Sequence, residues 1–192
     1  MNLQLPSQLE DLRDQFAQPW KQVSAVALIA WLVFYAAFLI YAFSDRTGYL
    51  FIDNVNLVIH EAGHPLFSYL GHTPMVWGGT LFELIVPASL AIYFAYLRQP
   101  AGFAFCAFFF FENFLYISVY MADARAQDLP LLTLGDPEFV EHDWFSIFSS
   151  LGVLEHDTQI AAVIRALGWL GMLATVAWLA SFYWRRAPLG ES

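Results

Sequence analysis

Residues 22–43 read QVSAVALIAWLVFYAAFLIYAF, a stretch of 22 residues without a charged side chain. About 20 such residues in an α-helix cross the hydrocarbon core of a bilayer. Residues 76–97 and 101–122 form two more runs of this length with one acid each, and residues 166–184 form a fourth. The sequence therefore predicts an all-α, polytopic membrane protein with at least four transmembrane helices.

The composition leads to the same class of protein. Of the 192 residues, 59% are hydrophobic and 13% are charged, and the predicted spans with their loops use most of the chain as one domain, residues 1–192. The net charge of −9 is concentrated in a predicted acidic loop, residues 123–160, which argues against nucleic acid as a partner. Residues 1–21 lack the basic start of a secretory signal and are expected to form a short interfacial helix before a retained anchor.

A fifth segment, residues 51–72, is long enough to cross the membrane but much more polar than the others. If it crosses, most of the basic residues fall outside, against the positive-inside rule. If it dips into the bilayer and returns, four spans place five basic residues inside and leave three outside: inside are Arg13, Lys21, Arg98, Arg185 and Arg186, and outside are Arg46, Arg125 and Arg165. The count favours a re-entrant segment, with a five-span arrangement as the alternative.

The polar segment contains IHEAGHPLF at residues 59–67, in which His60, Glu61 and His64 have the HExxH spacing of zinc hydrolases. Residues four apart on a helix share one face, so the two imidazoles can meet one ion. Glu61 is offset from His60 by about 100°, which suits a general base that takes a proton from a zinc-bound water. Pro65 removes a backbone N–H, so the helix is predicted to kink or end just after His64.

A catalytic zinc site needs a third protein ligand and leaves one position for water. The candidates are Glu83, Glu112, Asp123, His142 and His156. Glu112 lies near the middle of its span, where an unpartnered carboxylate is costly, and the motif histidines also lie near the middle of their segment. Depth therefore favours Glu112 as the third ligand, with Asp123 as the alternative. The two acids are eleven residues apart, about 16 Å along a helix, so they cannot both bind one ion.

Three further residues are candidates for supporting roles around this site. Glu83 is expected to accept a hydrogen bond from an imidazole N–H, unless it is simply a polar residue inside the bundle. Asn113 could hold a substrate backbone or an oxyanion, or make a helix-packing hydrogen bond. His142 could cover the site or supply a ligand, or be an ordinary loop histidine.

An HExxH motif in an apolar segment, a span containing Gly78-Gly79 and a later span with the remaining acid resemble the site-2 protease family of intramembrane zinc metalloproteases. The resemblance covers roughly residues 51–125, and HExxH is its only specific part. Family members take their third ligand from an LDG-type motif, which does not occur here, so Glu112 or Asp123 would stand in. The resemblance implies Zn²⁺ on His60 and His64, Glu61 as general base, and membrane-embedded peptides of other proteins as substrates.

The sequence thus favours a membrane-embedded zinc metalloprotease, with the lipid bilayer and a membrane protein or peptide as its partners. Two alternatives stay open. One keeps the zinc and takes a lipid or another amphiphile as substrate, and the other is a scaffold or assembly factor without catalysis. The low number of basic residues suits a bacterial inner membrane.

Overall fold

The computed structural model describes residues 7–130 and 142–184, and this part of the chain is helical and contains no β-strand. The α-helices are α1 (Ser7–Ala17), α2 (Ala25–Ser44), α3 (Asp53–Ser68), α4 (His72–Tyr96), α5 (Pro100–Ala122), α6 (Asp143–Leu151) and α7 (Asp157–Trp184), and a short 3-10 helix, η2 (Leu154–His156), precedes α7. The predicted all-α class is confirmed.

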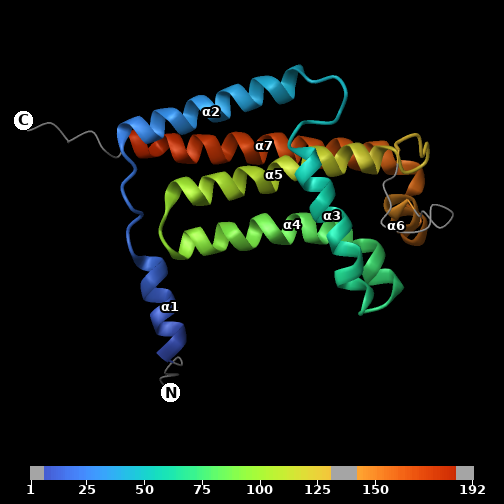
Figure 1. The fold of residues 1–192 in the computed structure, drawn as a ribbon, viewed down its shortest axis with the longest axis horizontal. Helices are drawn as coiled ribbons and strands as arrows, with labels where there is room; N and C mark the ends of the chain where they lie inside the picture. Colours follow the sequence, from blue (N-terminus) through green and yellow to red (C-terminus); the bar gives the residue numbers. More distant parts are fainter. Residues whose placement is uncertain (1–6, 131–141, 185–192) are drawn as a thin grey trace, which may run out of the picture.

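Within the described residues, four helices are long and apolar enough to cross a membrane: α2, α4, α5 and the Leu154–Phe182 stretch that contains most of α7. Figure 1 shows them side by side in the order α2, α7, α5, α4, with α2 and α4 running in opposite directions along the bundle. The chain is an integral, polytopic membrane protein. Because α2 and α4 are antiparallel, the segment that joins them begins and ends at the same end of the bundle and adds no fifth span.

Two of the four helices begin at least four residues earlier than the apolar runs predicted. Helix α4 starts at His72 rather than at residue 76, and α7 starts at Asp157 rather than at residue 166. The acidic Asp157 lies in the first turn of α7, where the helix dipole favours negative charge. Hydropathy marks only the part of a helix that enters the apolar core, so it misses polar first turns.

The bundle is held together by aromatic and aliphatic side chains on the facing sides of α2, α5 and α7. Leu28 and Tyr35 of α2 are fully buried, and the Tyr35 ring lies 4.7 Å from that of Phe108 on α5. On the outer side of α2, Val26 is 79% exposed. Apolar side chains that face outward suit a surrounding of lipid rather than water.

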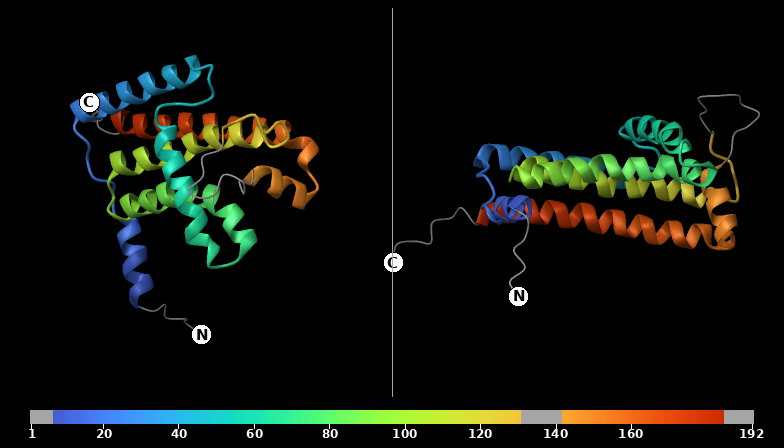
Figure 2. Two further views of the ribbon diagram at one scale, coloured as in Figure 1. Left: turned by 45° about the vertical axis from the view of Figure 1, so that its right-hand side comes forward. Right: turned by 90° about the horizontal axis from the view of Figure 1, so that it is seen from below.

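Helix α3 crosses the bundle instead of running along it, near the end that carries α6 (Figures 1 and 2). A Cβ atom on Gly63 would collide with the backbone oxygen of Gly78 in α4, so the two helices approach each other closely because both positions are glycine. Helix α3 continues for three residues after Pro65 and ends at Ser68, rather than ending directly after His64. The chain then turns at Gly71, whose φ of 111° suits glycine, into α4.

The opposite end of the bundle carries α1, which the sequence predicted as a short helix within residues 1–21 (Figure 1). Its Leu9, Leu12 and Phe16 are exposed apolar side chains, and Gln15 donates a hydrogen bond to the carbonyl oxygen of Tyr96, at 2.6 Å. A helix with an exposed apolar side next to the end of a spanning helix fits an interfacial position.

Candidate metal centre

The HExxH residues lie on α3 where it passes α4. His60 is buried and His64 is half-buried, and their ring centroids are 4.8 Å apart. The ring of His60 occupies space left by a missing side chain, because a Cβ on Gly79 would lie only 2.5 Å from its Cε1 and Nε2 atoms. Glycine at position 79 therefore makes room for the imidazole.

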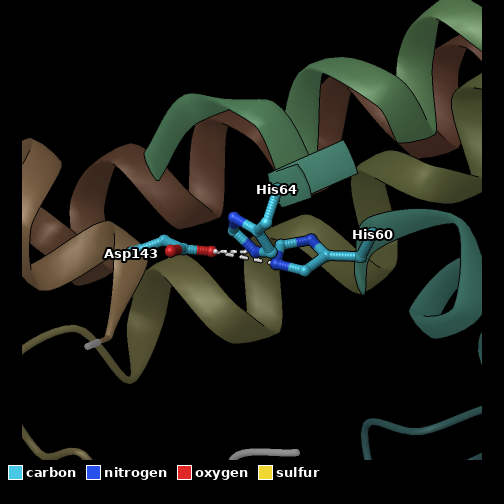
Figure 3. Close-up of side chains that lie close together, drawn as sticks. All are labelled: His60, His64 and Asp143. Carbon is cyan, nitrogen blue, oxygen red and sulfur yellow. Dashed lines mark hydrogen bonds and ion pairs between the residues drawn. The ribbon is translucent and has the colours of Figure 1, made fainter. Parts of the chain in front are cut away.

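The third residue of the cluster is Asp143, the first residue of α6. Its Oδ2 atom lies 2.9 Å from Nε2 of His60 and 3.3 Å from Nε2 of His64, as the dashed lines in Figure 3 mark. One nitrogen from each histidine and one carboxylate oxygen all lie within 4.8 Å of one another. Asp143 is 5% exposed, so this oxygen is turned into the protein and toward the imidazoles.

The other nitrogen of each imidazole has a partner of its own. Nδ1 of His60 lies 3.2 Å from Oε1 of Glu83, and Nδ1 of His64 lies 2.9 Å from the carbonyl oxygen of Met75. Both partners have acceptor oxygens, so a hydrogen on each Nδ1 would face an acceptor, and each Nε2 lies next to Asp143. With both rings neutral, two Nε2 lone pairs and a carboxylate oxygen face one another and can hold a cation between them; with protonated rings, the Nε2 hydrogens donate to Asp143 instead. This donor set fits a zinc ion, for which two imidazoles and a carboxylate are common ligands.

The electrostatics of the cluster also favour a cation. Burial by itself raises the pKa of Asp143, but hydrogen bonds from His60 and His64 outweigh it and hold the pKa below its usual range. Burial by itself lowers the pKa of His60, whereas Asp143 and Glu83 raise it to about 10. Asp143 and Glu83 thus stabilise a positive charge between them, carried either by a proton or by a metal ion.

Glu61 lies next to the cluster and outside the group of potential ligands. It is half-buried and interacts electrostatically with His60, His64 and Asp143. Burial raises the pKa of Glu61, and the two histidines oppose this rise. A carboxylate beside the ion position, and not part of it, can accept a proton from a molecule bound there.

A network at the start of α6 positions Asp143. The backbone N–H of Asp143 donates to the hydroxyl of Tyr120, at 3.1 Å. His142 caps the helix, because its Nδ1 accepts a hydrogen bond from the N–H of Phe145, and its Nε2 lies 3.4 Å from Oδ2 of Asp123. Burial lowers the pKa of His142, which keeps its ring neutral and suited to this role. His142 therefore supports the residue beside it and is not a ligand.

The third member of the cluster is where the sequence prediction and the structure differ. Glu112 belongs to a different group, in which its Oε2 accepts a hydrogen bond from Asn56, and Asp123 binds the backbone N–H groups of Asp128 and Leu129. Neither joins His60 and His64, and Asp143 stands in their place. The depth argument failed because α3 lies across the bundle, so the position of a histidine along its segment says little about its depth.

The remaining candidates are also accounted for. Glu83 faces His60, at the position expected for an acceptor of an imidazole hydrogen. Asn113 donates to the carbonyl oxygen of Phe109 in its own helix, which is the helix-packing alternative. His156 contacts Gln159, at 2.7 Å between Nδ1 and Oε1, away from the cluster.

Asp143 was not a candidate because it lies in a segment that the charge pattern assigned to an acidic loop. The available signal was its setting in HDWFSIF, where an acid precedes apolar residues at helical spacing.

Comparisons of this chain with family models, with curated proteins and with solved structures give no match.

Proposed function

We propose that this protein is a membrane-embedded, zinc-dependent hydrolase that cleaves peptide bonds of membrane proteins, as an intramembrane metalloprotease. The observation that carries the proposal is the convergence of His60 and His64 of α3 with Asp143 of α6, with Glu61 beside them. Two imidazoles, one carboxylate and a neighbouring glutamate are the parts that HExxH hydrolases use. The resemblance of residues 51–125 to site-2 proteases points to the same substrate class.

The roles of the residues follow from their positions. His60, His64 and Asp143 would hold the zinc ion, and Glu83 and the carbonyl of Met75 would fix the two rings through Nδ1. When bound, zinc lowers the pKa of a coordinated water to about 7. Glu61 would take the proton from the attacking water and pass it to the leaving amine.

The charge distribution supports an orientation in a bacterial inner membrane. Among the described residues, Arg13 lies in α1, Lys21 follows α1 and Arg98 follows α4. Arg46 follows α2, Arg125 follows α5, and Arg165 lies in α7 beside the α2–α3 connection. Figure 1 shows α1 at one end of the bundle and α6 at the other. Arg185 and Arg186, which the sequence also placed inside, fall outside the described residues. When Arg185 and Arg186 are counted from the sequence, the positive-inside rule favours the α1 end in the cytoplasm and the candidate metal centre near the opposite face.

The test of this proposal compares the wild type with Glu61→Gln after purification in detergent. We expect both proteins to retain one zinc ion per chain by elemental analysis, because Glu61 is not a ligand. We expect membranes that contain the wild type to accumulate new peptide termini, and membranes that contain the variant to lack them. A wild-type protein purified without metal would overturn the proposal, and released fatty acids or other amphiphiles in place of peptides would reassign the substrate.

A further inference from the structure

Tyr120, near the end of α5, lies at the candidate metal centre. Its hydroxyl oxygen accepts a hydrogen bond from the backbone N–H of Asp143, at 3.1 Å. Its ring lies beside two imidazoles, with its centroid 5.7 Å from that of His60 and 4.3 Å from that of His142. Three contacts therefore fix the position of this phenol next to two of the three potential metal ligands.

The hydroxyl of Tyr120 still has its own hydrogen to donate. Among the described residues it takes part in one hydrogen bond, as an acceptor, and a phenol that accepts one bond can donate another. The bond that it accepts comes from the first residue of α6, where the backbone N–H groups carry the positive end of the helix dipole. An N–H bonded to the phenol oxygen polarises the O–H bond and makes it a stronger donor.

The hydroxyl also lies on a side of the centre that a substrate can reach. His60 and Asp143 are buried, whereas Glu61 and Tyr120 are half-buried and the side chain of His64 is 23% exposed. The hydroxyl interacts electrostatically with the carboxylates of both Asp143 and Glu61. A molecule bound at the ion position can therefore contact Glu61 and the Tyr120 hydroxyl together.

Hydrolysis of a peptide bond needs a hydrogen-bond donor at this point. When water adds to the carbonyl carbon, the C=O electron pair moves to the oxygen, which becomes negative. The acids around the centre, Asp143, Glu61 and Glu83, repel that charge. Asn113, which the sequence offered for an oxyanion, donates to a backbone carbonyl of its own helix instead. The hydroxyl of Tyr120 is a donor at the centre that remains available.

We propose that Tyr120 is a catalytic residue that donates its O–H hydrogen bond to the oxyanion formed from the substrate carbonyl. The inference rests on the proposed hydrolase function. The attacking water adds to the carbonyl carbon, Glu61 takes its proton, and the hydroxyl holds the negative oxygen without giving up its own proton. When the C=O bond re-forms, the C–N bond breaks and Glu61 passes the proton to the leaving amine. The donor acts as charge develops, so it lowers the barrier more than it strengthens substrate binding.

The test measures inhibitor binding to the Co²⁺-substituted full chain in detergent, by the change in the Co²⁺ absorption spectrum. One probe is a phosphinic peptide with apolar side chains, whose tetrahedral phosphorus carries a negative oxygen. The other is a thiol peptide with the same side chains, which binds the metal through sulfur. In Tyr120→Phe we expect one Co²⁺ per chain, an unchanged affinity for the thiol peptide, and an affinity for the phosphinic peptide lowered about 10–100-fold, as for a lost hydrogen bond to a charged group.

Tyr116→Phe serves as the matched control. Tyr116 lies one turn earlier on α5, is also half-buried, and pairs its ring with that of Tyr49. It should change the affinity for neither peptide.

Two further replacements keep the test decisive if Tyr120→Phe loses its fold or its metal. O-methyltyrosine in place of Tyr120 keeps the oxygen that receives the N–H of Asp143 but has no hydrogen to donate. It should hold Co²⁺ and bind the phosphinic peptide weakly. In contrast, 4-aminophenylalanine at the same position keeps a donor and should restore the binding.

The outcomes separate this proposal from the proposed function. The role of Tyr120 is wrong if the phenylalanine or O-methyltyrosine variant binds the phosphinic peptide as tightly as the wild type, if both peptides weaken equally, or if 4-aminophenylalanine fails to restore binding. A hydroxyl that only positions Asp143 gives such results. A wild type that holds no metal, or that binds neither peptide, would instead contradict the hydrolase function itself.

Discussion

The three side chains of the candidate metal centre come from two helices, α3 and α6, and each is held by a second contact. Glu83 and the Met75 carbonyl hold the two imidazoles, and the Tyr120 hydroxyl holds the backbone of Asp143. Such outer contacts fix the tautomer and orientation of a ligand before the ion arrives, which lowers the cost of binding. The centre is therefore prearranged, and its ligands can be tested one at a time.

Replacing Asp143 by Ala should remove the third ligand. We expect the zinc content of Asp143→Ala to fall to that of His60→Ala, because two imidazoles alone hold zinc weakly. Elemental analysis of the purified proteins measures this, with Asp128→Ala as a control at an exposed acid of the preceding segment. Glu112→Gln should keep its zinc, and the reverse pattern would restore Glu112 as the ligand.

Glu83→Gln probes the residue behind His60 rather than a ligand. The amide oxygen can still accept the Nδ1 hydrogen, but the negative charge that supports the ion is lost. We expect one zinc ion per chain with an affinity lower by about 10–100-fold. Competition with a coloured chelator measures the affinity. Equal affinities in Glu83→Gln and the wild type would show that the contact between Glu83 and His60 has no effect on the metal.

At the scale of elements, the decisive contact is the crossing of α3 over α4. It brings the backbones of Gly63 and Gly78 together and leaves the ring of His60 beside Gly79. Small residues allow helices in membrane proteins to approach closely, because packing replaces the hydrophobic effect as the force between them. Helix α6 then completes the site from the far side of the sequence, 83 residues after His60.

Gly63→Ala should disturb this crossing, because the new methyl group meets a backbone oxygen that cannot move independently of α4. We expect a loss of about 1–3 kcal/mol in stability, as for other overpacked contacts, and a lower Tm in detergent. Ala62→Ser, at the exposed neighbouring position, should stay within about 0.5 kcal/mol of the wild type. A Tm for Gly63→Ala equal to that of the control would mean that the helices are less closely packed than the structure indicates.

At the scale of the whole molecule, four spans place both connections that build the metal centre at one end of the bundle. The α2–α4 connection carries α3, and the α5–α7 connection carries α6, while α1 and the α4–α5 turn lie at the other end (Figure 1). Between α3 and α6 the chain runs along the bundle twice, in α4 and then in α5. It therefore returns to the end where α3 lies, which allows His60 and Asp143 to meet.

Cysteine labelling in cells tests this topology, and Cys106→Ser supplies a background free of thiols. We expect Thr47→Cys, Thr73→Cys and Ser149→Cys to react with a membrane-impermeant reagent from one side, and Gln18→Cys from the other. All four positions are exposed. Labelling of Thr47→Cys and Thr73→Cys from opposite sides would mean that α3 spans the membrane.

The sequence by itself determined the four apolar helices and the HExxH pair, because hydrocarbon thickness and helical periodicity act on residues that are near in the chain. It also pointed to Glu83 as a neighbour of an imidazole. The third member of the candidate metal cluster was decided only by the tertiary structure, since Asp143 reaches His60 through the packing of α6 beside α3 and α4. The depth of a residue in its segment could not reveal this, because α3 turns across the bundle where two glycines let it approach α4.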